Sequence, residues 1–113
     1  MAQGAALNKY VLQIMDIVSK HIWSSGYSVT LYLFGSWARG NQKRTSDVDI
    51  ALLFHGGSVQ DHKNFISQTR SILEESTIPY HVDVVYMNDT SQALTERIKE
   101  EGIVWQGSMN GSR

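Results

Sequence analysis

The chain has 113 residues, of which 42% are hydrophobic and 19% charged, a balance typical of one soluble globular domain. Its formal charge is -1, from 10 Lys and Arg against 11 Asp and Glu, so extended binding along a nucleic-acid backbone is not expected. The absence of Cys excludes disulfides and thiolate metal sites and fits a cytoplasmic location. No apolar run approaches the roughly 20 residues that cross a bilayer, and no signal-peptide pattern is present, so no membrane contact is expected.

Residues 1–106 are predicted to form a single domain, and residues 107–113, which are rich in Gly and Ser, a flexible C-terminal tail. The first helix is predicted over residues 7–23, because apolar residues recur there at helical spacing. That apolar face comprises Leu7, Val11, Ile14, Met15, Val18 and Ile22. A β-rich run then predicts a strand over Val29–Phe34, and residues 37–39 are predicted to form a helical turn that Gly40 closes.

A second strand is predicted over residues 47–54, and because both of its faces are apolar after two acids, it should lie centrally in a sheet. A long helix is predicted over residues 59–76, followed by a strand over 80–87, a helix over 91–101 and a short extended piece over 103–105. The inward face of the long helix is predicted to carry Phe65, Ile66, Thr69, Ile72 and Leu73. The order α-β-α-β-α-β-α indicates an α/β fold of the α+β kind, with helices flanking a small central sheet. Because the connection between the first two strands is short and polar, we expect that sheet to be mixed.

The two acids that open the second strand are candidates for a metal site. Asp47 and Asp49 are two residues apart, so their side chains point to the same face, about 7 Å apart along the strand. Magnesium commonly binds to one or two carboxylates together with substrate phosphates. Two solvated acids would be the simpler interpretation of the pair alone, but here they adjoin a buried strand, where like charges repel unless a cation neutralises them.

The corner after the first strand is a candidate phosphate site. Gly35 lets the backbone approach a ligand closely, and Ser36 can cap the following turn, which would leave backbone N–H groups free for a phosphate. Arg39, Lys43 and Arg44 lie on the same connection and could neutralise phosphate charge. An ordinary tight turn followed by a solvated basic loop is the alternative.

A third acid interrupts the last apolar strand. Asp83 lies between Val82 and Val84, and a carboxylate buried there would need a partner. Metal coordination or a catalytic-base role would supply one, whereas an ion pair, with His81 as a candidate, or an edge position would also explain the acid.

Together these elements resemble a known family. Gly35 and Ser36, ten further residues and then Asp47-Val48-Asp49 form a pattern similar to the signature of the DNA polymerase beta-like nucleotidyltransferase superfamily. The text GSWARG followed by SDVDIALLF most resembles the minimal prokaryotic branch, the MNT proteins. The resemblance covers residues 31–86, and the helices on either side fit the order of elements in the family.

The resemblance implies a role for each of these positions. Gly35 and Ser36 would hold the triphosphate of ATP or another NTP, and Arg39 would assist. Asp47 and Asp49 would bind two Mg²⁺ ions, and Asp83 would bind the catalytic ion and help to activate the acceptor hydroxyl. The reaction would be in-line transfer of a nucleoside monophosphate, with AMP expected, and loss of pyrophosphate.

The acceptor is implied by the resemblance alone. MNT proteins commonly pair with a helical HEPN protein as the antitoxin of a toxin–antitoxin system, so this chain would attach AMP to a HEPN toxin. Two alternatives stay open: an MNT module that neutralises its HEPN partner by contact without catalysis, and a transferase that acts on small molecules of the aminoglycoside kind. The nucleotide and the oligomeric state are not specified by the sequence.

Overall fold

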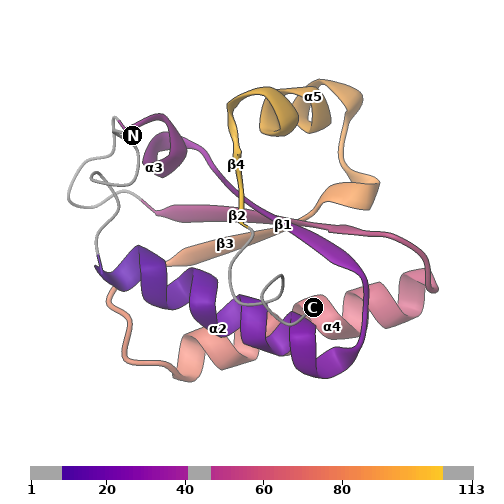
Figure 1. Cartoon of the computed structure of the whole chain (residues 1–113), viewed down its shortest axis with the longest axis horizontal. Coiled ribbons are helices and arrows are strands. Elements are labelled where there is room, and N and C mark those ends of the chain that lie inside the picture. Colours follow the sequence, from indigo (N-terminus) through magenta and orange to yellow (C-terminus); the bar gives the residue numbers. More distant parts are fainter. Residues whose placement is uncertain (1–8, 41–46, 106–113) are drawn as a thin grey trace.

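The computed structural model describes residues 9–40 and 47–105 as a sheet with helices on both faces (Figure 1). In chain order the elements are α2 (Lys9–Ser25), β1 (Val29–Phe34), α3 (Ser36–Arg39), β2 (Val48–Phe54), α4 (Val59–Glu75), β3 (Val82–Tyr86), the 3-10 helix η1 (Met87–Asp89), α5 (Gln92–Glu101) and β4 (Ile103–Val104). The predicted order of helices and strands is therefore confirmed. Leu7, Lys43, Arg44 and the predicted tail at 107–113 lie outside the described residues. In the described part of the chain, no helix combines the length and the apolar character that crossing a membrane would require.

The sheet is mixed, as predicted. Its strand order is β3-β2-β1-β4, with β1 antiparallel to both β2 and β4 and with β2 parallel to β3. The short connection through α3 can only return β2 antiparallel to β1, whereas α4 provides the crossover that a parallel pair needs. The prediction that β2 lies centrally is confirmed, and β3 forms one outer edge of the sheet.

One face of the sheet is covered by α2 and α4, which run below it in Figure 1. The main core lies here, and alternate residues of each strand enter it, among them Val48, Ile50 and Leu52 of β2. The predicted inner residues of α2 that are described are all buried: Val11, Ile14, Met15, Val18 and Ile22.

The inner face of α4 differs from the prediction at one position. Ile72 is 38% exposed, because it lies at the margin of a stripe that centres on His62, Thr69 and Leu73. His62 is buried there without loss of hydrogen bonds, since its ring nitrogens lie 2.8 Å from the Tyr86 hydroxyl and 2.7 Å from the Gly56 carbonyl.

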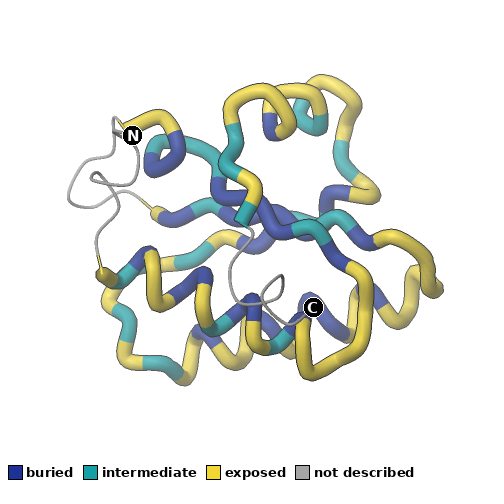
Figure 2. Tube along the Cα trace, in the orientation of Figure 1, coloured by how far each residue is buried: buried dark blue, intermediate teal, exposed yellow. Residues whose placement is uncertain are grey.

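The opposite face of the sheet is covered more thinly. A smaller buried cluster of Tyr32, Ala51, Met87 and Ile98 lies under α5, and Ile98 is the one buried residue of that helix. Figure 2 shows the sheet buried and most of α5 exposed. Among the described residues, the small core under α5 does not extend to Asp49, which is half-buried near the beginning of β2.

Candidate functional site

Three strands bring the predicted site residues into one row. Phe34, the last residue of β1, pairs with Asp49 of β2, and Asp49 pairs in turn with Asp83 of β3. Paired residues on neighbouring strands are about 5 Å apart and their side chains share a face. The Gly35–Ser36 corner, Asp49 and Asp83 are therefore neighbours, although 46 residues lie between the corner and Asp83 in sequence.

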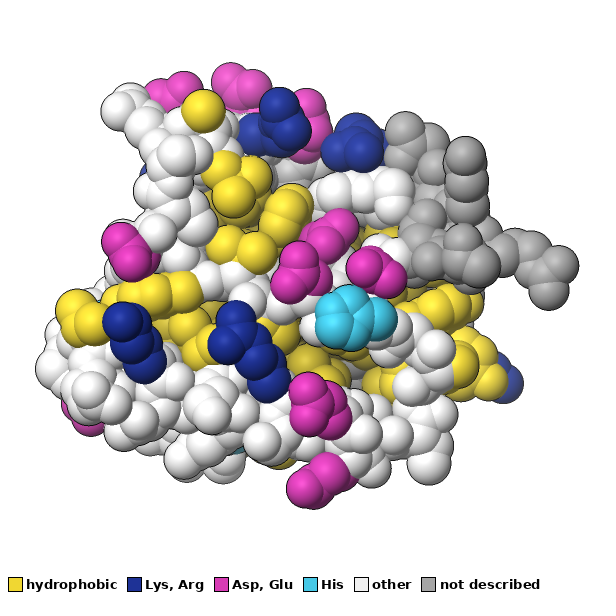
Figure 3. All heavy atoms as spheres, turned by 180° about the vertical axis from the view of Figure 1, so that it is seen from behind, with side chains coloured by type: hydrophobic (Ala, Val, Ile, Leu, Met, Phe, Trp, Pro, Cys, Tyr) yellow, Lys and Arg dark blue, Asp and Glu magenta, His cyan; other side chains and the backbone are white. Residues whose placement is uncertain are grey.

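The acids lie on the thinly covered face of the sheet. Val48 and Ile50 enter the main core, so the alternate residue Asp49 points to the other side, and Asp47 shares that side. Figure 3, which views the molecule from behind, shows acidic side chains gathered between its upper and lower parts, with a histidine beside them. Asp47 and Asp83 are exposed and Asp49 is half-buried.

Of the alternatives that the sequence left open for Asp83, the structure shows the edge position. Because β3 is the outer strand of the sheet, its residues on the α5 side are open to solvent, and Asp83 is exposed. In the described part of the chain it makes no hydrogen bond or ion pair with His81. The edge position explains the acid without a buried partner, so the case for function depends on its pairing with Asp49.

Asp49 is the acid whose ionisation is most strongly affected by its surroundings. Partial burial raises the pKa of its carboxyl, and the negative charges of Asp83 and Asp47 raise it further. The positive charges of Arg39 and His81 act in the opposite direction on the same pKa. An anion that is half-buried between two like charges is a favourable place for a cation to bind.

The corner beside Asp49 requires glycine. Gly35 has φ 76° and ψ -156°, a region that essentially only glycine adopts. A Cβ at this position would also overlap Oδ2 of Asp49 and lie 3.2 Å from its Cγ. The backbone of the corner is therefore in contact with the carboxylate that the other two acids flank.

Ser36 does not cap the turn, although its residue type allows it. Gly35 is the capping residue of α3, its carbonyl accepts from the amides of Ala38 and Arg39 at 3.1 Å, and no side chain caps this end. Ser36 is instead the first residue of the helix, half-buried next to the glycine. Its hydroxyl is thus not committed to a cap at the position where a phosphate is expected.

Arg39 lies at the rim of the site and has an ion-pair partner that the sequence did not indicate. Its Nη1 lies 3.5 Å from Oε1 of Glu101 on α5, and both side chains are more than 40% exposed. Such a pair contributes at most about 1 kcal/mol. A ligand phosphate could therefore compete with Glu101 for the guanidinium.

Aromatic rings fix the corner relative to the third strand. Trp37 of α3 packs against Tyr80, which precedes β3, with ring centroids 5.4 Å apart, and Tyr80 also contacts Tyr10 of α2 at 5.8 Å. Trp37 is buried. These contacts join the helix that follows Gly35 to the segment that carries Asp83.

The acids fit magnesium that arrives with a nucleotide better than a closed metal cage. Among residues 9–40 and 47–105, no three His, Cys, Asp or Glu side chains converge closely enough to hold a metal by themselves. Magnesium retains water and completes its shell with one or two carboxylates and substrate phosphates. Asp49 with Asp47 or Asp83 would supply the carboxylates in that arrangement.

Comparison with known proteins places this geometry in a family. The family model described as polymerase beta, nucleotidyltransferase, matches residues 14–106. A Methanocaldococcus jannaschii protein that is inferred to be a protein adenylyltransferase is 36% identical over 72 residues, which are 63% of this chain and 72% of that protein.

Solved structures share the fold. An inferred minimal nucleotidyltransferase is 25% identical, with a TM-score of 0.57, over 82% of this chain and 90% of that chain. In a toxin–antitoxin complex with AMP-PNP, a chain is 24% identical, with a TM-score of 0.58, over 87% of this chain and 77% of that one. A chain in a complex of tri-AMPylated Shewanella oneidensis HEPN toxin with MNT antitoxin is 19% identical, with a TM-score of 0.55, over 89% of this chain and 76% of that one.

Proposed function

Because the chain belongs to the polymerase beta nucleotidyltransferase family, in its minimal branch, we propose that it transfers AMP from ATP to a hydroxyl group of a partner protein. The observation that carries the proposal is the row formed by Gly35, Asp49 and Asp83 on the thinly covered face of the sheet. Two acids and a close-approach glycine meet there, which is what a metal–triphosphate substrate requires.

In this proposal the chain binds ATP at the corner between β1 and α3. Gly35 lets the triphosphate approach the backbone, the uncommitted hydroxyl of Ser36 donates to a phosphate oxygen, and Arg39 leaves Glu101 to neutralise phosphate charge. Asp47, Asp49 and Asp83 would hold two Mg²⁺ ions. Bound magnesium would supply the positive charge that stabilises the attacking and departing oxygens.

The transfer exchanges the phosphoanhydride bond between the α- and β-phosphates of ATP for a phosphate ester bond to the acceptor. The acceptor oxygen forms a bond to the α-phosphorus, and the bond from that phosphorus to the bridging oxygen breaks, so that pyrophosphate leaves with the electron pair. Asp83 takes the hydroxyl proton, because it is the acid on the outer strand and is open to an incoming acceptor. The products are an AMP ester of the acceptor and pyrophosphate.

We further propose that the acceptor is a HEPN-family toxin and that this chain is its antitoxin, acting in the cytoplasm. The support is the fold shared with chains from toxin–antitoxin complexes, one with AMP-PNP and one with a tri-AMPylated HEPN toxin. The relative inferred to be a protein adenylyltransferase supports a protein acceptor independently. A HEPN protein encoded beside this chain would be the first acceptor to test.

Labelled ATP tests the proposal. The chain would be incubated with Mg²⁺, α-labelled ATP and the neighbouring HEPN protein, and label on the partner is the expected result. Complex formation without label would indicate a module that neutralises by contact, and label on an added aminoglycoside would indicate a small-molecule transferase. Either of those results would overturn protein adenylylation.

A further inference from the structure

The outer edge of β3 lies beside the acids and is unpaired in the described part of the chain. β3 ends the strand order, with β2 as its one described neighbour. An unpaired edge presents a row of backbone donors and acceptors that can receive another strand. This edge is the part of the sheet that an acceptor must approach to reach Asp83.

The register shows which backbone groups face outward. The amide of Val48 donates to the carbonyl of His81 at 3.0 Å, so in a parallel ladder His81, Asp83 and Val85 direct their backbone groups toward β2. The alternate residues Val82, Val84 and Tyr86 consequently direct theirs outward.

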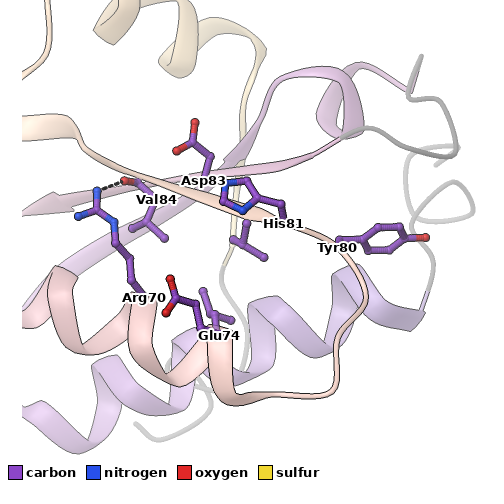
Figure 4. Close-up of a pocket in the computed structure, with 8 residues that line it drawn as sticks. Arg70, Glu74, Tyr80, His81, Asp83 and Val84 are labelled. Carbon is purple, nitrogen blue, oxygen red and sulfur yellow. Dashed lines mark hydrogen bonds between the residues drawn. The ribbon is translucent and has the colours of Figure 1, made fainter.

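Arg70 confirms that the backbone of Val84 faces outward. Its Nη2 donates to the Val84 carbonyl at 2.9 Å, reaching from α4 to the outer side of β3 (Figure 4). A strand added at this edge would take over the Val84 carbonyl, so the Arg70 side chain would move aside to admit it. The amides of Val82 and Val84 are not covered by this contact.

A pocket lies on the α4 side of the same edge. It has a volume of about 140 Å³ and is lined by Arg70, Leu73, Glu74 and the segment 80–84. A cavity of about 150 Å³ holds a group the size of benzene, so this pocket has room for one side chain. Figure 4 shows Arg70 and Glu74 rising into it from α4, while the carboxylate of Asp83 points to the opposite side of β3.

We infer that the outer edge of β3 receives an extended segment of the acceptor protein as an added strand. Side chains alternate along such a strand, so a hydroxyl residue opposite Asp83 would lie on the acid face, and the residue next to it would enter the pocket. The inference rests on the proposed function, because it assigns the acceptor to the site described above.

Glu74 favours Lys or Arg as the side chain that enters the pocket. Among the described residues Glu74 forms no ion pair, and Arg70, one turn before it on α4, contacts the Val84 carbonyl instead. A basic side chain in the pocket would pair with Glu74, on the opposite side of the strand from Asp83. The expected acceptor is therefore an extended segment with a hydroxyl residue directly next to a basic one.

Proline in place of Val82 tests the edge. Val82 is the first residue of β3, a position that tolerates proline, and Val82→Pro removes an outward amide while leaving the ladder to β2 intact. Val82→Ala is the matched control, because it loses more side-chain packing but keeps the amide. With the neighbouring HEPN protein as probe, Val82→Pro should weaken binding about tenfold, and Val82→Ala should bind like the wild type.

A charge reversal tests the pocket. Glu74→Lys should lower the rate of AMP transfer to synthetic peptides with Lys next to Tyr, relative to peptides with Glu next to Tyr. Glu75→Lys makes the same charge change one residue away, at an exposed position that does not line the pocket, and should leave this preference unchanged. If Glu74→Lys and Glu75→Lys have the same preference between the two peptides, the pocket assignment is wrong. It is also wrong if neither peptide accepts AMP.

The measurements distinguish an error in the added-strand inference from an error in the proposed function. Asp47→Asn with Asp49→Asn should abolish transfer and leave partner binding intact, whereas Val82→Pro should weaken binding itself. If Val82→Pro and Val82→Ala bind the partner equally, or if neither the wild type nor the variants bind it, the added strand is wrong. If sedimentation shows a dimer that Val82→Pro dissolves, the occupant of the edge is a second copy of the chain and the acceptor assignment is overturned.

Discussion

The two faces of the sheet have separate tasks. The face under α2 and α4 carries the larger core, and strand residues there are apolar and buried. The face under α5 has a small core at one end and three acids at the other. Consecutive residues of β2 serve the two faces in turn, so Val48 and Ile50 stabilise the strand that presents Asp49. The comparison teaches that the site can carry unfavourable like charges because the opposite face supplies the stability.

The largest effect is expected when the charge of the acids on the α5 face is removed. Asp47→Asn with Asp49→Asn should abolish transfer, with a loss of roughly 10²–10³-fold or more, because metal ions contribute several kcal/mol to the transition state. The fold should remain, since neither side chain belongs to a core. Initial rates of label transfer measure the first effect, and thermal unfolding measures the second. Transfer at the wild-type rate would show that the metal assignment is wrong.

A core substitution should have the opposite signature. Leu52→Ala, on the α4 face, should lower the free energy of unfolding by about 2–5 kcal/mol, because the side chain is fully buried. Leu94→Ala on α5 should lower it by clearly less, since Leu94 is half-buried beside the smaller core. Denaturant unfolding would compare them. Equal losses would contradict the division between the faces.

The glycine corner should be sensitive in both stability and activity. Gly35→Ala places a side chain in a backbone region whose strain is about 1–3 kcal/mol and also pushes against Asp49. Gly40→Ala is the control, because Gly40 also has a positive φ of 81° but a Cβ there would meet open space. Only Gly35→Ala should weaken ATP binding, as calorimetry would measure. Equal weakening by both variants would mean that the corner does not contact the nucleotide.

The smallest effect concerns the ionisation of Asp49. The folded protein raises the pKa of this carboxyl, so its charged form destabilises the fold above that pKa and protonation removes the penalty as the pH falls. Without divalent metal, Asp49→Asn should therefore raise the melting temperature at neutral pH, and the gain should shrink on acidification. Melting curves from neutral to acidic pH in chelator would show the trend. A gain in melting temperature that grows toward acidic pH would contradict a raised pKa for Asp49.

Much of the fold followed from local patterns in the sequence. The apolar character of both faces of residues 47–54 after the two acids predicted that β2 lies centrally, and the short polar connection after Phe34 predicted the mixed sheet. The row of Gly35, Asp49 and Asp83 depends on register between strands, which no local pattern encodes. The resemblance to a family gave the residues a common role before the register placed them side by side.

What the sequence left open depends on neighbours that are distant along the chain. The valines beside Asp83 left a buried or an edge position open, and only the strand order shows that β3 is an edge. The contacts of Arg39 with Glu101 and of Arg70 with the Val84 carbonyl join elements through tertiary packing, so spacing along the chain could not reveal them. Ser36 could cap α3 by its residue type, but the conformation of Gly35 shifts the cap by one residue.

The most direct test of the site is to locate the bound cation. Mn²⁺ prefers the same oxygen ligands as Mg²⁺ and broadens the NMR signals of nearby nuclei. Titrated with a non-hydrolysable ATP analogue, it should first broaden the amides of Gly35, Ser36, Asp49 and Asp83, while those of the α4 face, such as Thr69, stay sharp. Broadening centred elsewhere, or none at the row of Gly35, Asp49 and Asp83, would contradict the account.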